Sequence, residues 1–161
     1  MKPKVLVDYF IRPACDYISE YCPNCNGPNS VQMMLAIAAQ ESHCGMYFKQ
    51  VGGGPARGVW QVETRSSEDV LENFVAHKNG LADLLMSMYS PVLKYAHIQS
   101  PLYNCAIARL ILYRYPEAMP DLDDKDGMWE FYKHRYNSEY GAAEQHEWDK
   151  NWDMFVAGIS I

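Results

Sequence analysis

Two glutamates and an amide lie close together in the segment AAQESHCGMYFKQVGGGPARGVWQVE, residues 38–63. Glu41 comes at the end of an apolar stretch, and Gln61 and Glu63 follow a run of glycines. A carboxyl group beside apolar side chains is poorly solvated when charged, so its pKa rises and it can stay protonated near neutral pH. A general acid needs that neutral form, and we expect Glu41 to act as one.

Residues 31–42 predict the helix that positions Glu41. Met34, Ile37, Ala38 and Glu41 are spaced i, i+3, i+4 and i+7, so they share one helix face. The glutamate therefore continues an apolar stripe. The alternative, which the sequence leaves open, is a glutamate that is simply solvated on the helix surface.

Residues 58–63, GVWQVE, alternate in the way that is typical of a short strand or one half of a small hairpin. Alternation would place Val59, Gln61 and Glu63 on one face. If that face meets the helix end, Glu41 and Glu63 form an acid/base pair across a cleft. Such pairs cleave glycosidic bonds, with about 6.5–9.5 Å between the carboxyl groups when water attacks directly. An exposed acid at a strand end is the alternative for Glu63.

The rest of the chain predicts short helices separated by glycine, proline and asparagine. We expect them over residues 5–21, 31–42, 66–80, 81–90, 101–115, 128–137 and 144–158. The 161 residues contain no repeat or linker-like tract, so we expect a single domain over residues 1–161. The expected fold class is mainly α, with one small β element beside the helix that carries Glu41.

Composition narrows the possible functions. Hydrophobic residues make up 48% of the chain and aromatic residues 13%, which is typical of a globular protein. The net charge of −6 argues against a nucleic-acid partner. Asp8, Arg12 and Asp16 interrupt the first apolar stretch, so we expect neither a signal peptide nor a membrane span, and synthesis in a cytoplasm.

The chain has five cysteines, an odd number that fits a reducing compartment and leaves at least one thiol free. Cys22 and Cys25 have the spacing of a zinc or redox pair, but no second CxxC or HxxxH follows. His43 and Cys44 are the nearby candidate ligands. We expect no metal or cofactor and interpret CPNC as a tight Pro-Asn turn with two half-buried thiols.

Four segments together resemble a known family. AIAAQES, followed about twenty residues later by ARGVWQVE, resembles the soluble lytic transglycosylases and goose-type lysozymes of the lysozyme-like superfamily. In that family a Glu-Ser ends a helix, and a Gly-x-x-Gln-hydrophobic strand lines the sugar cleft. NCAIARLILYRY, from Asn104, is similar to the helix after its β region, and RYNSEYG to its Tyr-Asn-x-Gly signature. The four segments occur in family order over about residues 31–141.

The resemblance implies a role for each matching residue. Glu41 would be the catalytic general acid, with Ser42 beside it. Gln61 would bind an N-acetyl group or orient a sugar, Tyr136 would contact the catalytic carboxyl, and Asn137 would fix the local turn. We therefore expect Ser42, Gln61, Tyr136 and Asn137 to form the substrate-binding set.

The implied activity is cleavage of peptidoglycan between N-acetylmuramic acid and N-acetylglucosamine. Glu63 matches a position where goose-type lysozymes carry an aspartate and transglycosylases usually carry no acid. A lysozyme would use Glu63 to deprotonate water, whereas a lytic transglycosylase would use Glu41 twice and the muramic acid C6 hydroxyl as nucleophile. Both routes remain open.

The combination of motifs looks most like members encoded by tailed bacteriophages, although Ser138, Glu139 and Tyr140 replace the usual Ala-Gly. The expected partners are peptidoglycan glycan strands and virion proteins. The protein would act in the periplasm or cell wall, as a free endolysin or as cargo of a virion. The alternative is a virion structural or assembly protein that keeps the lysozyme-like fold without catalysis.

Overall fold

A computed structural model describes residues 1–50, 52–89, 100–137 and 141–161. The described part of the chain is mainly helical, as the sequence predicts. The helices are α1 (Pro3–Leu6), η1 (Val7–Ile11), α2 (Arg12–Ser19), α3 (Pro28–Ser42), α4 (Thr64–Asn73), η2 (Val75–His77), α5 (Leu81–Ser87), α7 (Pro101–Tyr113), α8 (Lys125–Tyr132), η3 (Lys133–Asn137) and α9 (Gln145–Phe155). No helix within the described ranges is long and apolar enough to span a membrane.

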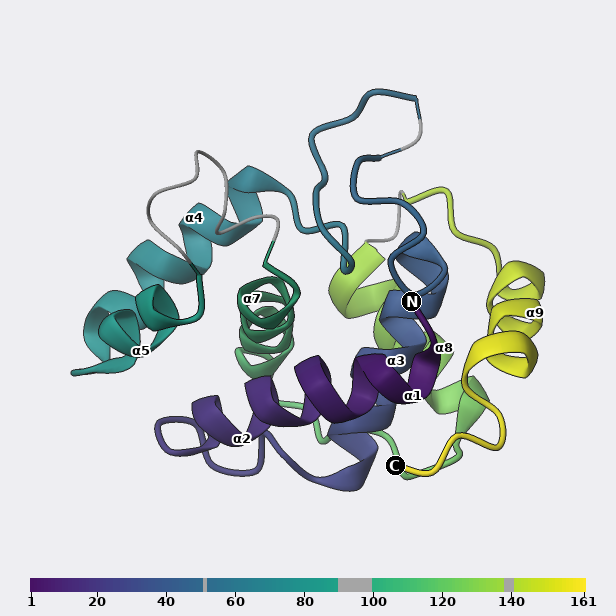
Figure 1. Cartoon of the computed structure of the whole chain (residues 1–161), viewed down its shortest axis with the longest axis horizontal. Helices are drawn as coiled ribbons and strands as arrows, with labels where there is room; N and C mark the ends of the chain where they lie inside the picture. The colour runs from purple at the N-terminus through teal and green to yellow at the C-terminus, as the bar shows by residue number, and fades with distance from the viewer. Residues whose placement is uncertain (51, 90–99, 138–140) are drawn as a thin grey trace.

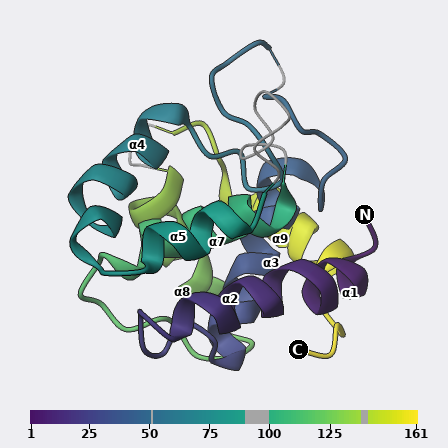
Figure 2. The same cartoon turned by 60° about the vertical axis from the view of Figure 1, so that its left-hand side comes forward.

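Helix α3 lies near the middle of the molecule, whereas α4 and α5 lie beyond α7 (Figures 1 and 2). It packs against α2, α7 and α9. Every residue from Ser30 to Ala39 is buried, so the helix is enclosed on all sides and not only along one stripe. An almost continuous apolar sequence suits such a position, because no face of the helix has to meet water.

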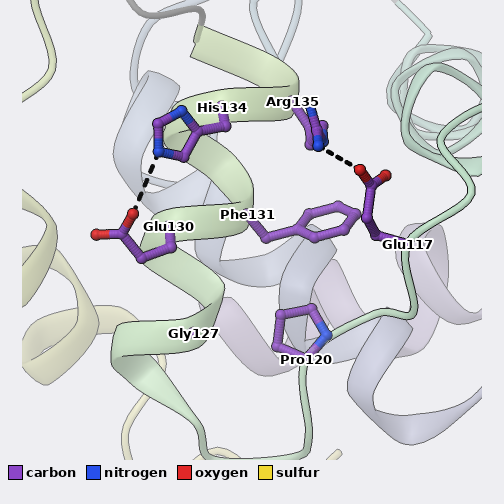
Figure 3. A pocket seen from close by; sticks show the side chains of 7 residues that line it. All are labelled: Glu117, Pro120, Gly127, Glu130, Phe131, His134 and Arg135. Carbon is purple, nitrogen blue, oxygen red and sulfur yellow. Dashed lines mark hydrogen bonds and ion pairs between the residues drawn. The ribbon is translucent and has the colours of Figure 1, made fainter.

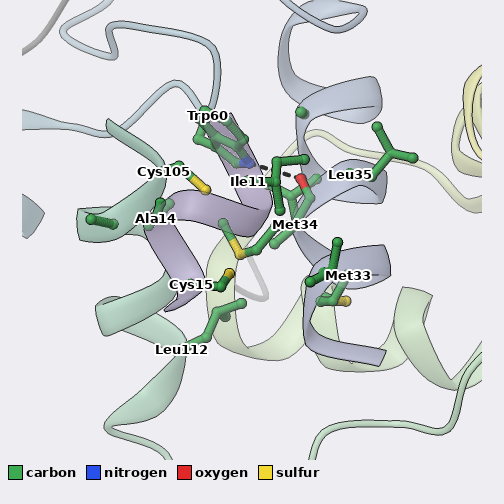
Figure 4. Packing of buried hydrophobic residues seen from close by; sticks show 14 of the residues in the cluster. Ile11, Ala14, Cys15, Met33, Met34, Leu35, Trp60, Cys105 and Leu112 are labelled. Carbon is green, nitrogen blue, oxygen red and sulfur yellow. Dashed lines mark hydrogen bonds between the residues drawn. The ribbon is translucent and has the colours of Figure 1, made fainter. Parts of the chain in front are cut away.

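Trp60 connects the segment after α3 to the core. Its indole is fully buried and its Nε1 donates a hydrogen bond of 2.8 Å to the carbonyl of Met34. Figure 4 shows Trp60 directed toward α3, with Ile11 and Cys105 among its neighbours in the core. The Trp60 ring therefore packs in the interior and is not available to stack on a ligand.

Residues 43–50 and 52–63 extend beyond the helices and return to α4 (Figure 1). The prediction of a strand over residues 58–63 is wrong, because the described part of this segment contains only isolated antiparallel bridges. Arg57 and Val62 exchange two backbone hydrogen bonds, of 3.1 and 2.9 Å, across a tight turn. Gly58 and Gln61 have left-handed φ values of 80° and 46°, which reverse the chain and end the alternation.

Loss of the alternation separates the three side chains that were expected to share a face. Val59 and Gln61 are buried, whereas Glu63 is exposed and immediately precedes α4. The small β element predicted beside the helix of Glu41 is therefore a hydrogen-bonded turn. We call residues 57–62 the site turn.

Asn104 of α7 holds the site turn by two hydrogen bonds. Its Oδ1 accepts from the backbone N–H of Trp60 at 2.9 Å, and its Nδ2 donates to the carbonyl of Arg57 at 3.3 Å. The Asn104 side chain lies so close to Gly58 that a Cβ there would overlap with Oδ1. Glycine is thus required at this position both by its φ and by the space that Asn104 occupies.

We expect Gly58→Ala to lower the free energy of unfolding more than Gly158→Ala, measured by urea denaturation. Both glycines have positive φ, which costs about 1–2 kcal/mol for alanine, but nothing lies within 4 Å of a Cβ at Gly158. Gly58→Ala also displaces Asn104, whose lost hydrogen bonds add about 1–3 kcal/mol. Equal effects of the two substitutions would contradict this description of the site turn.

Candidate active site

The carboxyl group of Glu41 lies in the last turn of α3 and is mostly enclosed by protein. Its Oε1 accepts a hydrogen bond of 2.7 Å from the hydroxyl of Tyr132, the last residue of α8. The Tyr132 ring stacks on Trp148 of α9, with 5.1 Å between ring centroids and 24° between planes. Packing of α8 against α9 therefore fixes the hydroxyl that meets Glu41.

Burial raises the pKa of Glu41 from 4.5 to about 7. Desolvation is the main cause, and the negative charge of Glu63 raises the pKa further, whereas the hydrogen bond from Tyr132 opposes both. Burial and the charge of Glu41 also raise the pKa of Tyr132, so its hydroxyl keeps its proton and stays a donor. Because Oε1 accepts that hydrogen bond, we expect Oε2 to carry the proton of the neutral acid.

Ser42 joins the end of α3 to the site turn. Its buried hydroxyl donates to the carbonyl of Val59 at 2.6 Å and accepts from the N–H of Gly45 at 2.8 Å. His43, Cys44 and Gly45 all have left-handed φ, so the chain turns away sharply after the acid. The predicted residue is thus beside Glu41, as expected, but its hydroxyl is bonded within the protein.

Gln61 is also held by backbone groups. Its Nε2 donates to the carbonyl of Gly58 at 2.7 Å and to that of Tyr47 at 3.3 Å, and its side chain is 7% exposed. These bonds connect the site turn to the segment that follows α3. Any contact of Gln61 with a ligand would therefore have to come through its amide oxygen.

Tyr136 and Asn137 approach the site from η3. The Tyr136 hydroxyl donates to the carbonyl of Trp60 at 2.6 Å, so it contacts the site turn, and Tyr132 makes the contact with Glu41 that we expected of Tyr136. Asn137 lowers the pKa of Tyr132 slightly against the larger effect of burial, and its Oδ1 accepts from Lys133 Nζ at 3.2 Å. Residues 138–140 of the same motif lie outside the described residues.

Glu63 is brought near Glu41 without joining its hydrogen-bond network. Its side chain is exposed at the start of α4, and its charge nevertheless acts on the Glu41 carboxyl. The pair therefore consists of one enclosed acid and one solvated carboxylate. Such an asymmetry is what acid/base chemistry between two carboxyl groups requires.

Tyr136 also borders a pocket of about 260 Å³ between α4, α7 and η3, which includes Ser66, Asp69 and Arg114 in its lining. The outward side of α8 carries a different pocket (Figure 3). There the ion pairs of Arg135 with Glu117 and of His134 with Glu130 flank Phe131. Glu117 and Glu130 both have partners in this pocket, and none of the residues predicted for the site lines it.

Sequence reasoning missed Tyr132 as the partner of Glu41. The signal was its spacing, since Trp129, Tyr132 and Tyr136 fall on one helical face, a pattern that also describes a packed aromatic face. Which of these rings meets the carboxyl depends on how α8 is rotated against α3. No group of three or more His, Cys, Asp or Glu that could hold a metal occurs among the described residues.

Comparison of the chain with family models, with curated proteins and with solved structures gives no match. The candidate site is therefore defined by its own geometry: an enclosed carboxyl, the hydroxyl that contacts it, a fixed turn and a second carboxylate nearby.

We expect Tyr132→Phe and Glu63→Gln to move the pKa of Glu41 in opposite directions. Tyr132→Phe removes a hydrogen bond that lowers it, so the pKa should rise above 7, whereas Glu63→Gln removes a negative charge, so it should fall. NMR titration of the Glu41 carboxyl carbon measures both shifts. Glu72→Gln, the same charge change at an exposed position of α4, is the control and should leave the pKa unchanged.

The raised pKa of Glu41 should also make stability fall as pH rises. Between pH 4.5 and 7 the unfolded chain releases this proton while the folded protein retains it, so folding loses up to about 3 kcal/mol. Urea denaturation across this range should show the loss in the native protein and not in Glu41→Gln. If the difference in stability between the two proteins does not change with pH, the pKa of Glu41 is not raised in the folded protein.

Proposed function

We propose that this protein is a muramidase, which cleaves the glycosidic bond between N-acetylmuramic acid and N-acetylglucosamine in bacterial peptidoglycan. The observation that carries the proposal is the enclosed Glu41 carboxyl with a pKa of about 7, hydrogen-bonded to Tyr132. A carboxylic acid that is half protonated at neutral pH is suited to protonate a leaving sugar oxygen. The four ordered motifs of the sequence support the choice of substrate.

In the first step, Glu41 gives the proton on Oε2 to the glycosidic oxygen, and the bond to the anomeric carbon breaks. The carboxyl becomes an anion inside a poorly solvated site. The Tyr132 hydroxyl, 2.7 Å from Oε1, then makes a charge-assisted hydrogen bond that stabilises this anion. Tyr132 thus contributes more to the product of proton transfer than to the starting acid.

The second step has two routes, which differ in the use of Glu63. In hydrolysis, the exposed Glu63 carboxylate deprotonates a water molecule that attacks the anomeric carbon. In transglycosylation, the Glu41 anion takes a proton from the C6 hydroxyl of the muramic acid, which closes a 1,6-anhydro ring. Only the first route needs a second carboxylate.

We expect Glu41→Gln to lower the rate of peptidoglycan digestion by about 10²–10⁴-fold, the usual contribution of a general acid. Turbidity loss of outer-membrane-permeabilised cells measures the rate. In the native protein, kcat/KM should fall above pH 7 as Glu41 loses its proton. Absence of digestion by folded native protein would contradict the proposal and favour the non-catalytic virion protein.

Mass spectrometry of the released muropeptides separates the two routes. If the muropeptides have reducing ends, the reaction is hydrolysis, and Glu63→Gln should lose most of the activity. Glu72→Gln is the charge-matched control. If the muropeptides have 1,6-anhydro ends, the reaction is transglycosylation, and Glu63→Gln should remain active. Products cut elsewhere than at the muramic acid linkage would be inconsistent with a muramidase of either kind.

A further inference from the structure

The turn between α2 and α3 holds two thiols that the proposed function does not use. Cys22 and Cys25 are both reduced and fully buried, while Pro23 and Asn24 between them are exposed. Asn24 has a φ of 67°, and a proline followed by a residue with positive φ is the pattern of a type II turn. Such a turn brings its first and fourth Cα atoms within about 7 Å, the separation that a disulfide spans.

The two thiols already influence each other. Their mutual interaction is the main cause of the lowered pKa of Cys22 and of the raised pKa of Cys25. The positive charges of Lys78 and Arg109 lower the pKa of Cys22 further. The pair thus combines a thiol that favours the thiolate with a neighbour that keeps its proton, as a dithiol exchange site needs.

Arg109 places a buried positive charge next to this turn. Its side chain is 4% exposed, and its Nε donates to the carbonyl of Cys25 at 3.3 Å. Its Nη2 donates to Ser30 Oγ at 3.2 Å, whereas its Nη1 has no hydrogen-bond partner among the described residues. A buried cation whose partners here are neutral groups favours a nearby anion, and a Cys22 thiolate would supply one.

We propose that Cys22 and Cys25 are a redox-active pair that closes reversibly to a disulfide in the folded protein. The Cys22 thiolate attacks a sulfur of a small disulfide oxidant, forming a mixed disulfide and releasing one thiolate. Cys25 then loses its proton and attacks the Cys22 sulfur, which releases the second thiolate. The pair gives up two electrons, and the oxidant is reduced to two thiols.

The location of the pair gives the oxidised form a structural effect. The disulfide would join the segment after α2 to the segment before α3 within one turn, at the end of α3 opposite to Glu41. Opening of the exposed Pro23-Asn24 turn would admit the oxidant without unfolding either helix. This proposal is independent of the proposed function, because it invokes no residue of the candidate active site.

The other cysteines are internal controls. Cys15 and Cys105 also interact, but they belong to α2 and α7 in the core (Figure 4), and burial raises the pKa of Cys105. Burial likewise raises the pKa of Cys44 to about 11. Neither Cys105 nor Cys44 favours a thiolate, so both should remain reduced where Cys22 and Cys25 are oxidised.

The test is equilibration of the folded native protein in glutathione buffers of increasing oxidised fraction, followed by acid quench, alkylation and peptide mass spectrometry. We expect a disulfide that links Cys22 to Cys25, a mass lower by two hydrogens, and full recovery of both thiols with dithiothreitol. Cys15, Cys44 and Cys105 should be alkylated only after denaturation. The oxidised protein should have a melting temperature a few degrees higher, because the closed loop restricts the unfolded chain.

Three outcomes would overturn the proposal: two free thiols at Cys22 and Cys25 in fully oxidised glutathione, a disulfide that forms first at Cys15 and Cys105, or one equivalent of zinc retained at the turn. Cys25→Ser provides a second test, since the folded variant should accumulate a glutathione adduct on Cys22. Cys44→Ser, the matched control, should oxidise as the native protein does. Circular dichroism establishes that each variant is folded.

Discussion

Burial of one carboxyl group at the end of the central helix is the constraint on which the rest of the site depends. Helix α3 is enclosed by protein along most of its length, so Glu41 emerges where few water molecules can solvate a charge. A buried carboxyl needs a hydrogen-bond partner, and Tyr132 supplies it from a helix that lies 91 positions further along the chain. The stacked rings of Tyr132 and Trp148 keep that donor in place. The acid and its partner thus depend on the packing of α8 and α9 around α3.

The site turn is ordered without a sheet. Three tethers from separate helices fix it: Ser42 to Val59 from α3, Asn104 to Trp60 from α7, and the Tyr136 hydroxyl to the Trp60 carbonyl from η3. These side chains pair with backbone groups that a strand partner would otherwise satisfy. The anchoring of the Trp60 indole on Met34 adds a fourth attachment in the core. The site turn, which contains one glycine, can therefore present a fixed surface beside the acid.

The two ends of α3 have opposite electrostatic character. At its start, the buried Arg109 favours negative charge on a nearby thiol, and at its end, burial and Glu63 disfavour negative charge on Glu41. The fifteen residues of the helix separate these environments by about 20 Å. Low solvation raises the pKa in both places. It is the main cause of the shift at Glu41, whereas at Cys22 the interaction with Cys25 and the positive charges of Lys78 and Arg109 outweigh it.

The sequence by itself determined the helical class, the approximate positions of the helices and the identity of Glu41 as an acid beside apolar residues, because these follow from local periodicity and composition. It failed at residues 58–63, where alternation predicted a strand but the left-handed Gly58 and Gln61 and the close approach of Asn104 impose a turn. The alternation shows only which of these residues are apolar. It cannot reveal the contact with Asn104, because that residue lies far away in the sequence. Only the tertiary structure decided that Tyr132 and not Tyr136 meets the carboxyl, since both lie on one helix face and the rotation of α8 against α3 selects between them. The tertiary structure also decides the value of the Glu41 pKa, because desolvation depends on all the groups that surround the carboxyl and not on any single neighbour in the chain.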